Sequence, residues 1–256
     1  MKVFFISTYF YDTNIYHCRL CLRSIVLTSK LALLFPPACN LAIDVGFVLD
    51  ASGRVGHNNF RRIKKFVELV SRSFSISRSR ARVGVIVYGS SARMQFGLNW
   101  YTNPRRLNRA IRRMRYTRGS RRTGKALQLA VGALFRRSRR KRVLITVMSG
   151  PSYDSVKIPS LQIHRAGIEV FAVGVTTQMR NQELRAIATD SRHIYMVNFN
   201  SLYGIVKSIV RKACRGIFKI SLFFSVQKYY YNQTFLLCEN IETILRVLTV
   251  FYYLSS

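Results

Sequence analysis

Acidic residues are scarce in this sequence of 256 residues, which contains 10 Asp and Glu against 42 Lys and Arg. The formal net charge of +32 means that the chain attracts polyanions and repels other copies of itself. Nucleic acid, sulfated glycan and anionic membrane surfaces are all admissible partners on charge alone. The charge therefore indicates a class of partner, the polyanions, without selecting one member of that class.

Apolar runs of membrane-spanning length are also missing. Runs near the C-terminus, such as Ile220–Phe224 and Val247–Leu254, fall short of the ~18 uninterrupted apolar residues that cross a bilayer. Neither Met1–Tyr11 nor Ile25–Phe35 has the charged start, long apolar centre and small-residue cleavage site of a regular signal peptide. We therefore expect no membrane span, and we interpret residues 1–38 as an imperfect signal region or an end foreign to the native product.

Cysteine is sparse as well, with five residues in the chain. Cys18 and Cys21 have the C-x-x-C spacing of a redox motif or of half a zinc site, but no second C-x-x-C follows them. This absence argues against a zinc-binding module. Cys39 and Cys214 differ from that pair because they bracket the whole region of patterned hydrophobicity, although two unrelated buried thiols would fit the same positions.

Catalytic motifs are absent from the sequence. His57, His164 and His193 fall in different segments, and none has an acid or a nucleophile at the spacing of a known motif. The dipeptide at Gly124 and Lys125 lacks the upstream glycine of a phosphate-binding Walker loop. We therefore expect a protein that is not an enzyme.

The most informative stretch is Val45–Ser52, an apolar run that ends in a carboxylate, a small residue and a hydroxyl. It is typical of a buried parallel strand that delivers Asp50 and Ser52 to its carboxyl end. In an open α/β sheet that end faces the crevice where ligands bind, and both side chains supply oxygen ligands suited to a divalent cation. Alone, an acid followed two residues later by a serine is a weak signal.

Strands and helices alternate along the rest of the patterned region. Hydrophobic periodicity and turn residues predict strands at 83–88, 93–96, 143–148, 168–173 and 193–197, and helices at 57–74, 103–113, from 123 onward, at 181–188 and at 202–212. The strand at 93–96 follows its predecessor too closely for a crossover helix, so we expect it to be an antiparallel edge strand. The alternation implies a mostly parallel sheet wrapped on both faces.

Four segments in this order resemble the von Willebrand factor A-type domain, the module of matrilins, collagen VI chains and integrin inserted domains. They are Val45–Ser52, Val83–Tyr88, Thr123–Leu127 and Ala166–Val175. The resemblance covers residues 39–214, and it leaves both residues 1–38 and an apolar tail at 215–256 unexplained.

This resemblance implies the fold and the cysteine pairing. The family has a doubly wound, Rossmann-like α/β fold with a mostly parallel sheet, one antiparallel edge strand and helices on both faces. In secreted members a terminal disulfide closes the domain at the places that Cys39 and Cys214 occupy here.

The resemblance also implies a metal-ion-dependent adhesion site, from which this sequence departs. The family motif D-x-S-x-S keeps Asp50 and Ser52 here but has Arg54 in place of its last hydroxyl. Arg121 replaces a threonine of the second loop, and Ser149 replaces an aspartate after the strand at 143–148. Because Mg²⁺ demands near-octahedral oxygen coordination, we expect no functional Mg²⁺ site and no cofactor.

Two interpretations of the new cations remain open. In the favoured one, Arg121 neutralises Asp50, because a carboxylate in a partly buried crevice needs a partner. In the other, Arg54 and Arg121 bind an acidic ligand directly, since a guanidinium matches a carboxylate or sulfate in two hydrogen bonds.

The densest charge lies in the run that contains Arg136, Arg137, Arg139, Arg140, Lys141 and Arg142. A solvated loop is the simplest interpretation, but charges this dense are costly to hold together without an anionic partner. We favour a sulfated glycosaminoglycan, because the family and the cysteine pair point outside the cell. Nucleic acid is second, since no aromatic residues interleave with this run to stack on bases.

The sequence therefore predicts a secreted, extracellular and non-catalytic adhesion module that binds matrix proteins or sulfated glycans. The alternative is an intracellular basic protein that associates with nucleic acid.

Overall fold

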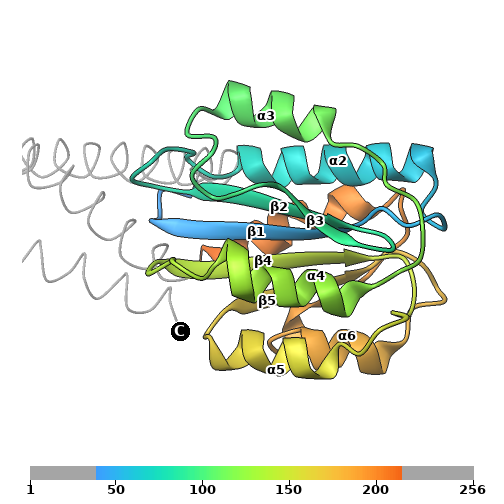
Figure 1. Cartoon of the computed structure of the whole chain (residues 1–256). Coiled ribbons are helices and arrows are strands. Elements are labelled where there is room, and N and C mark those ends of the chain that lie inside the picture. Colours follow the sequence, from blue (N-terminus) through green and yellow to red (C-terminus); the bar gives the residue numbers. More distant parts are fainter. Residues whose placement is uncertain (1–38, 215–256) are drawn as a thin grey trace, which may run out of the picture.

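The computed structural model describes residues 39–214, and the structural statements below refer to that part of the chain. A central six-stranded sheet carries helices on both faces (Figure 1). Its strands are β1 (Ile43–Asp50), β2 (Arg82–Tyr88), β3 (Ala92–Phe96), β4 (Lys141–Met148), β5 (Glu169–Gly174) and β6 (Ile194–Met196). The α-helices are α2 (His57–Arg72), α3 (Pro104–Arg113), α4 (Thr123–Leu129), α5 (Lys157–Arg165), α6 (Asn181–Ile187) and α7 (Val206–Ala213).

The strand order is β3-β2-β1-β4-β5-β6, and every pair is parallel except β2 with β3. This arrangement confirms the predicted fold class, including the antiparallel edge strand. The chain winds from β1 toward β2 in one direction and toward β4 in the other. The carboxyl end of β1, where Asp50 lies, is therefore the point at which the winding reverses and where open α/β sheets bind ligands.

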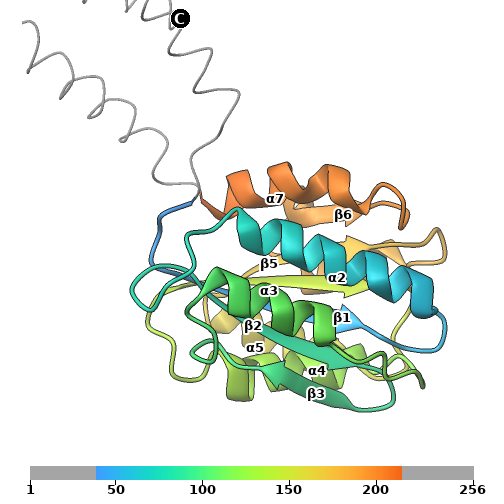
Figure 2. The same ribbon diagram turned by 90° about the horizontal axis from the view of Figure 1, so that it is seen from above.

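Two apolar cores lie on either side of the sheet. Helices α2, α3 and α7 cover one face, and α4, α5 and α6 cover the other (Figures 1 and 2). On the second face the sheet comes very close to the π-helical turn Ala130–Leu134 that extends α4. A Cβ atom on Gly46 would lie 2.6 Å from the ring of Phe135, and one on Gly84 would lie 2.4 Å from Leu134. Glycine in these two strands is what permits the close packing.

The structure differs from the sequence prediction in three places. Helix α5 was missed, because its Pro159 disguises the pattern and its Ile158 and Leu161 are exposed rather than buried. Strand β4 begins at Lys141, so the last two cations of the basic run lie in a strand and not in a loop. The segment predicted as a helix from Leu202 begins as a 3₁₀ turn before α7.

Several features named from the sequence lie outside the described residues, among them Cys18, Cys21 and the apolar runs of residues 215–256. Within residues 39–214, no helix combines the length and the apolar character that crossing a bilayer requires.

A disulfide joins Cys39 to Cys214, the pair that the resemblance implies. The two residues are 175 positions apart in sequence, and their Cα atoms lie 6.1 Å apart. Cys39 also pairs with the end of α2, since its N–H donates to the carbonyl of Ser73 and its own carbonyl accepts from Ser75. The cross-link thus closes nearly the whole described region into one loop at the edge where the domain begins and ends.

Removing this cross-link should destabilise the domain strongly, because closing so long a loop restricts the unfolded chain. We expect the double variant Cys39→Ser, Cys214→Ser to lose about 3–5 kcal/mol in the free energy of unfolding. Urea unfolding with and without a reductant measures the loss. Reductant should bring the wild-type chain to the stability of the variant and leave the variant unchanged; a wild-type chain that ignores reductant would contradict the assignment.

A buried glutamate fastens α3 to α2. The side chain of Glu68 is 4% exposed and accepts hydrogen bonds from Arg72 on its own helix at 2.5 Å and from Arg112 on α3 at 2.8 Å. Lys65 approaches it at 3.5 Å. The hydrogen bond from Arg112, together with the neighbouring cations, lowers the pKa of Glu68 despite its burial.

Because the pKa of Glu68 is lowered on folding, its ionised form stabilises the fold above the ordinary glutamate pKa. That contribution is lost as the pH falls through the lowered value. Glu68→Gln should cost about 1–3 kcal/mol at neutral pH, and the difference from the wild type should shrink on acidification. Chemical unfolding between neutral and acidic pH measures it.

Glu183→Gln is the matched control, because burial raises the pKa of Glu183 and reverses the sign of the linkage. If the cost of Glu68→Gln is the same at every pH, the charged contacts of Glu68 do not hold the two helices together.

Candidate functional site

The candidate site lies at the carboxyl ends of β1 and β4, which are neighbouring parallel strands. Asp50 is the last residue of β1, and Ser52 lies in the loop that follows it. Ser149 comes directly after β4, and Arg121 lies in the loop before α4. The fold thus brings four of the predicted site residues to one edge of the sheet, with Arg54 further along the first loop.

Asp50 is fully buried, and donors from this protein occupy both of its carboxylate oxygens. Oδ1 accepts the backbone N–H of Ser52 at 2.8 Å. Oδ2 accepts the backbone N–H of Ser149 at 3.0 Å and its hydroxyl at 2.5 Å. The serine that replaces a family aspartate therefore donates its side-chain hydroxyl to the carboxylate of Asp50. The side chain of an ionised aspartate has no proton to donate.

Arg121 forms no ion pair with Asp50 within residues 39–214, so the structure does not contain the direct contact favoured from the sequence. Its side chain is largely buried, and its Nε donates to the carbonyl of Pro151 at 2.9 Å. Its guanidinium lies 5.0 Å from the ring centre of Tyr153, a cation–π distance. Within residues 39–214, Asp50 forms no ion pair.

Arg54 forms no ion pair with the carboxylate either, within the described residues. It is exposed, and its Nη1 donates to Oε1 of Gln178 at 3.0 Å. The two arginines therefore have different neighbours, Gln178 for one and the loop after β4 for the other.

The residues present are a poor match for Mg²⁺. The buried hydroxyl of Ser52 has no hydrogen-bond partner within the described residues, so it is available as a ligand. The carboxylate of Asp50 and the hydroxyl of Ser149 already take part in the hydrogen bonds given above. Within residues 39–214 no group of three or more His, Cys, Asp or Glu side chains is placed to hold a metal ion. Mg²⁺ in proteins is held by one or two carboxylates together with water, and the one carboxylate at this position already accepts three hydrogen bonds.

Sequence reasoning missed the acids that shape the loop after β4. Asp154 accepts the backbone N–H groups of Gly124 at 2.8 Å and Lys125 at 2.9 Å, and so caps α4 from a different segment. Glu183 on α6 accepts the backbone N–H of Ser152 at 3.0 Å. Burial raises the pKa of Glu183. The sequence offered one hint that Asp154 and Glu183 have structural roles: they are two of seven acidic residues between positions 39 and 214.

One histidine lies between two carboxylates. Nδ1 of His193 is 2.7 Å from Asp190, and Nε2 is 2.9 Å from Glu169. Its ring packs on Phe171 with the ring centres 4.7 Å apart. Neither ring nitrogen contacts a serine, threonine or cysteine in the described structure, so His193 has acids beside it without a nucleophile.

The basic run lies at the opposite edge of the sheet, because it enters β4 at its amino end (Figure 1). Half of its cations bind within the domain. Arg140 donates to two carbonyls, those of Arg78 and Arg80, Lys141 pairs with Glu169 at 3.1 Å, and Arg142 donates to the carbonyl of Ala166. The other three, Arg136, Arg137 and Arg139, are exposed and have no such partner among the described residues.

Comparison with known proteins agrees with this geometry. A family model described as von Willebrand factor type A domain matches residues 44–208. Mouse vitrin is 35% identical over 181 residues, which cover 69% of this chain and 28% of vitrin. Human cochlin is 29% identical over 202 residues, which cover 77% of this chain and 36% of cochlin. The matched region is thus about a third or less of either relative.

A solved structure shares the fold. Proximal thread matrix protein 1 from the mussel byssus, in a form with a zinc-occupied MIDAS motif, superimposes with a TM-score of 0.66 at 25% sequence identity. The match covers 70% of this chain and 47% of the mussel protein. Since the family model spans residues 44–208 and vitrin matches more than two thirds of the chain, the chain belongs to the von Willebrand factor type A domain family.

Proposed function

We propose that residues 39–214 form an extracellular, non-catalytic adhesion module that binds acidic or sulfated matrix partners without a functional metal site. The observation that carries this proposal is the state of Asp50, whose two oxygens accept hydrogen bonds from Ser52 and Ser149. A metal bound by that carboxylate would have to share it with these hydrogen bonds. Adhesion in this chain therefore depends on its own cations.

The disulfide and the relatives support a location outside the cell. A structural disulfide persists in oxidising compartments and is rare in the cytosol and nucleus. The bond between Cys39 and Cys214 therefore favours secretion over the alternative of an intracellular protein that binds nucleic acid. The mussel protein, which shares the fold, is by its name a thread matrix protein.

The metal proposal is tested by restoring the missing ligands. The unmodified chain should bind neither Mg²⁺ nor Zn²⁺ specifically in a calorimetric titration. The triple variant Arg54→Ser, Arg121→Thr, Ser149→Asp should gain binding, because it adds a carboxylate and two hydroxyls and removes two positive charges.

The single variant Ser149→Asp, which keeps both arginines, separates the effect of the carboxylate from that of the cations. Saturable micromolar binding to the unmodified chain, lost in Asp50→Asn, would contradict the proposal.

We place the polyanion contact at the exposed part of the basic run. Arg136, Arg137 and Arg139 keep their full hydrogen-bonding capacity for a ligand, whereas the next three cations already bind carbonyls or Glu169. Three neighbouring guanidinium groups can each release a counterion from a linear polyanion, and this release makes affinity fall as salt rises.

The variant Arg136→Ser, Arg137→Ser, Arg139→Ser should therefore bind heparin more weakly and with a shallower dependence of log affinity on log salt, the slope decreasing by about 2–3. Affinity measured over a salt series gives that slope. A matched control removes three exposed arginines from α3, in Arg105→Ser, Arg109→Ser, Arg113→Ser. Equal losses from both triple variants would show diffuse attraction by net charge and would remove the basic run as a site.

A further inference from the structure

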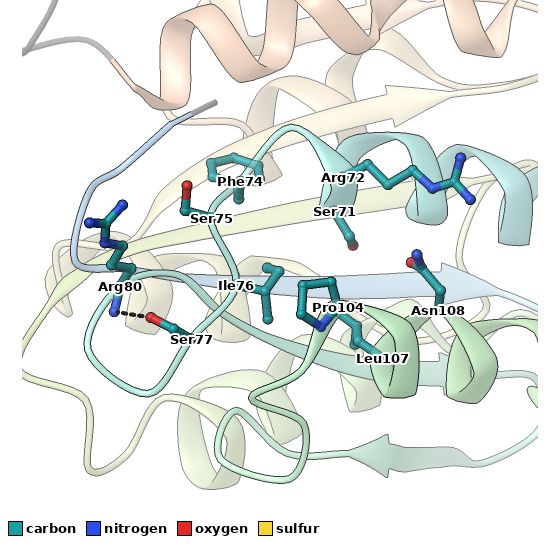
Figure 3. A pocket seen from close by; sticks show the side chains of 10 residues that line it. All are labelled: Ser71, Arg72, Phe74, Ser75, Ile76, Ser77, Arg80, Pro104, Leu107 and Asn108. Atoms are coloured by element: carbon teal, nitrogen blue, oxygen red, sulfur yellow. Dashed lines mark hydrogen bonds between the residues drawn. The ribbon is translucent and has the colours of Figure 1, made fainter. Parts of the chain in front are cut away.

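A pocket of about 430 Å³ lies between the C-terminal end of α2, the segment that follows it and the first turns of α3 (Figure 3). Helix α2 runs back from the carboxyl edge of the sheet, so its last residues lie at the amino edge, away from Asp50. The pocket is therefore separate from the family site. Its volume falls within the range of small-ligand and side-chain pockets in proteins.

The middle of the pocket is apolar. Its lining includes Phe74, Ile76, Pro104 and Leu107, and Figure 3 shows these four side chains gathered between the two arginines of the lining. Phe74 is 3% exposed and Leu107 is 1% exposed, so they belong to the core and present only an edge to the pocket. An apolar group that entered here would extend the existing core and gain the free energy of leaving water.

One buried hydroxyl in the lining lacks a hydrogen-bond partner within the described residues. The side chain of Ser71 is 1% exposed, and its Oγ has no partner within the described residues. In Figure 3 it points into the pocket, toward the side where Asn108 lies. A hydroxyl that is shut away from water without a partner costs free energy, and a polar backbone group of a ligand would recover it once the lining opens enough to admit that group.

The rim of the pocket is cationic. Arg80 and Arg72 lie at its two ends in Figure 3, and no carboxylate is among the ten lining residues. Arg72 already pairs with Glu68. Arg80 binds the neutral side chain of Asn40 at 2.7 Å, so no carboxylate in the described structure compensates its charge. An anionic group beside the apolar centre would meet an uncompensated guanidinium.

We propose that this pocket is a docking site for an acidic peptide segment that inserts one apolar side chain between Ile76 and Leu107 and places a carboxylate at Arg80. The apolar centre favours a peptide over a sulfated glycan, because a sugar unit would bury several hydroxyls against it. The Ser75 and Ser77 hydroxyls of the lining already form hydrogen bonds, to Asn40 and Ser79. The inference rests on the proposed function in one respect, that the domain binds partners, but it uses a different edge of the domain.

The test uses the full chain and a fluorescent five-residue peptide with leucine at its centre and glutamate at the other four positions. Fluorescence anisotropy at about 0.15 M ionic strength limits diffuse attraction by the strongly basic chain. Replacing the central leucine with glycine keeps the charge, and it should weaken binding about tenfold because the apolar contact is lost.

Two variants of the protein locate the contact. Asn108→Trp fills the pocket without changing charge and should weaken binding at least about tenfold. Arg80→Glu should weaken it about fivefold, whereas Arg165→Glu makes the same charge change on the exposed end of α5, across the sheet, and should have little effect. If Asn108→Trp does not fold, the amide chemical shifts of Ser75 and Ile76 on adding the peptide serve in its place.

Equal binding of the leucine and glycine peptides would overturn the proposal, because it would show attraction by charge alone. So would equal losses from Arg80→Glu and Arg165→Glu. Shifts at Ser75 and Ile76 caused by a heparin-derived disaccharide and not by the peptide would assign the pocket to a glycan. The heparin measurements on the basic run are independent of these results, so failure at one edge is distinguishable from failure of the adhesion function.

Discussion

Residues 39–214 contain only seven carboxylates, against 34 lysines and arginines. Each of the seven carboxylates accepts hydrogen bonds or forms ion pairs within the domain. Asp44 accepts hydrogen bonds from Nε and Nη2 of Arg82, at 2.7 and 2.5 Å, and so links β1 to β2 at the amino edge of the sheet. Glu68 fastens α3 to α2, and Asp154 caps α4 from the loop after β4. Because there are so few carboxylates, their positions determine which elements are linked by ion pairs and charged hydrogen bonds.

The same scarcity shapes the surface. Because the carboxylates are occupied inside the domain, most of the remaining cations have no acidic partner and face solvent. Of the five exposed arginines on α3, for example, only Arg112 pairs with a carboxylate in the described structure, and that carboxylate, Glu68, also pairs with Lys65 and Arg72 of α2. Mutual repulsion among these cations lowers the free energy of unfolding of the domain. The cross-link between Cys39 and Cys214 offsets such a cost, because it acts on the unfolded chain and does not depend on charge.

Much of the fold follows from the sequence, because buried strands and their turn residues are local signals. The helix cap at Asn103 is another local signal, because its side chain accepts hydrogen bonds from the backbone N–H groups of Arg105 and Arg106, two and three residues later. The site was less predictable. That Asp50, Ser52 and Ser149 meet follows from parallel strands, but the direction of Arg121 depends on the carbonyl of Pro151 and the ring of Tyr153, which no spacing reveals. Long side chains choose among several partners by tertiary packing.

The two edges of the sheet differ in how many of their polar groups are already hydrogen-bonded within the domain, and this difference affects where a ligand can bind. At the carboxyl edge, Asp50 is satisfied by its own loops, so a ligand there would have to compete with hydrogen bonds that already exist. At the amino edge, Arg136, Arg137 and Arg139 are exposed, and the pocket beside α3 keeps an unpartnered hydroxyl and the uncompensated charge of Arg80. A ligand gains most where it replaces water and displaces no internal bond. On the function proposed above, the favourable binding surface lies at the opposite edge of the sheet from the family site.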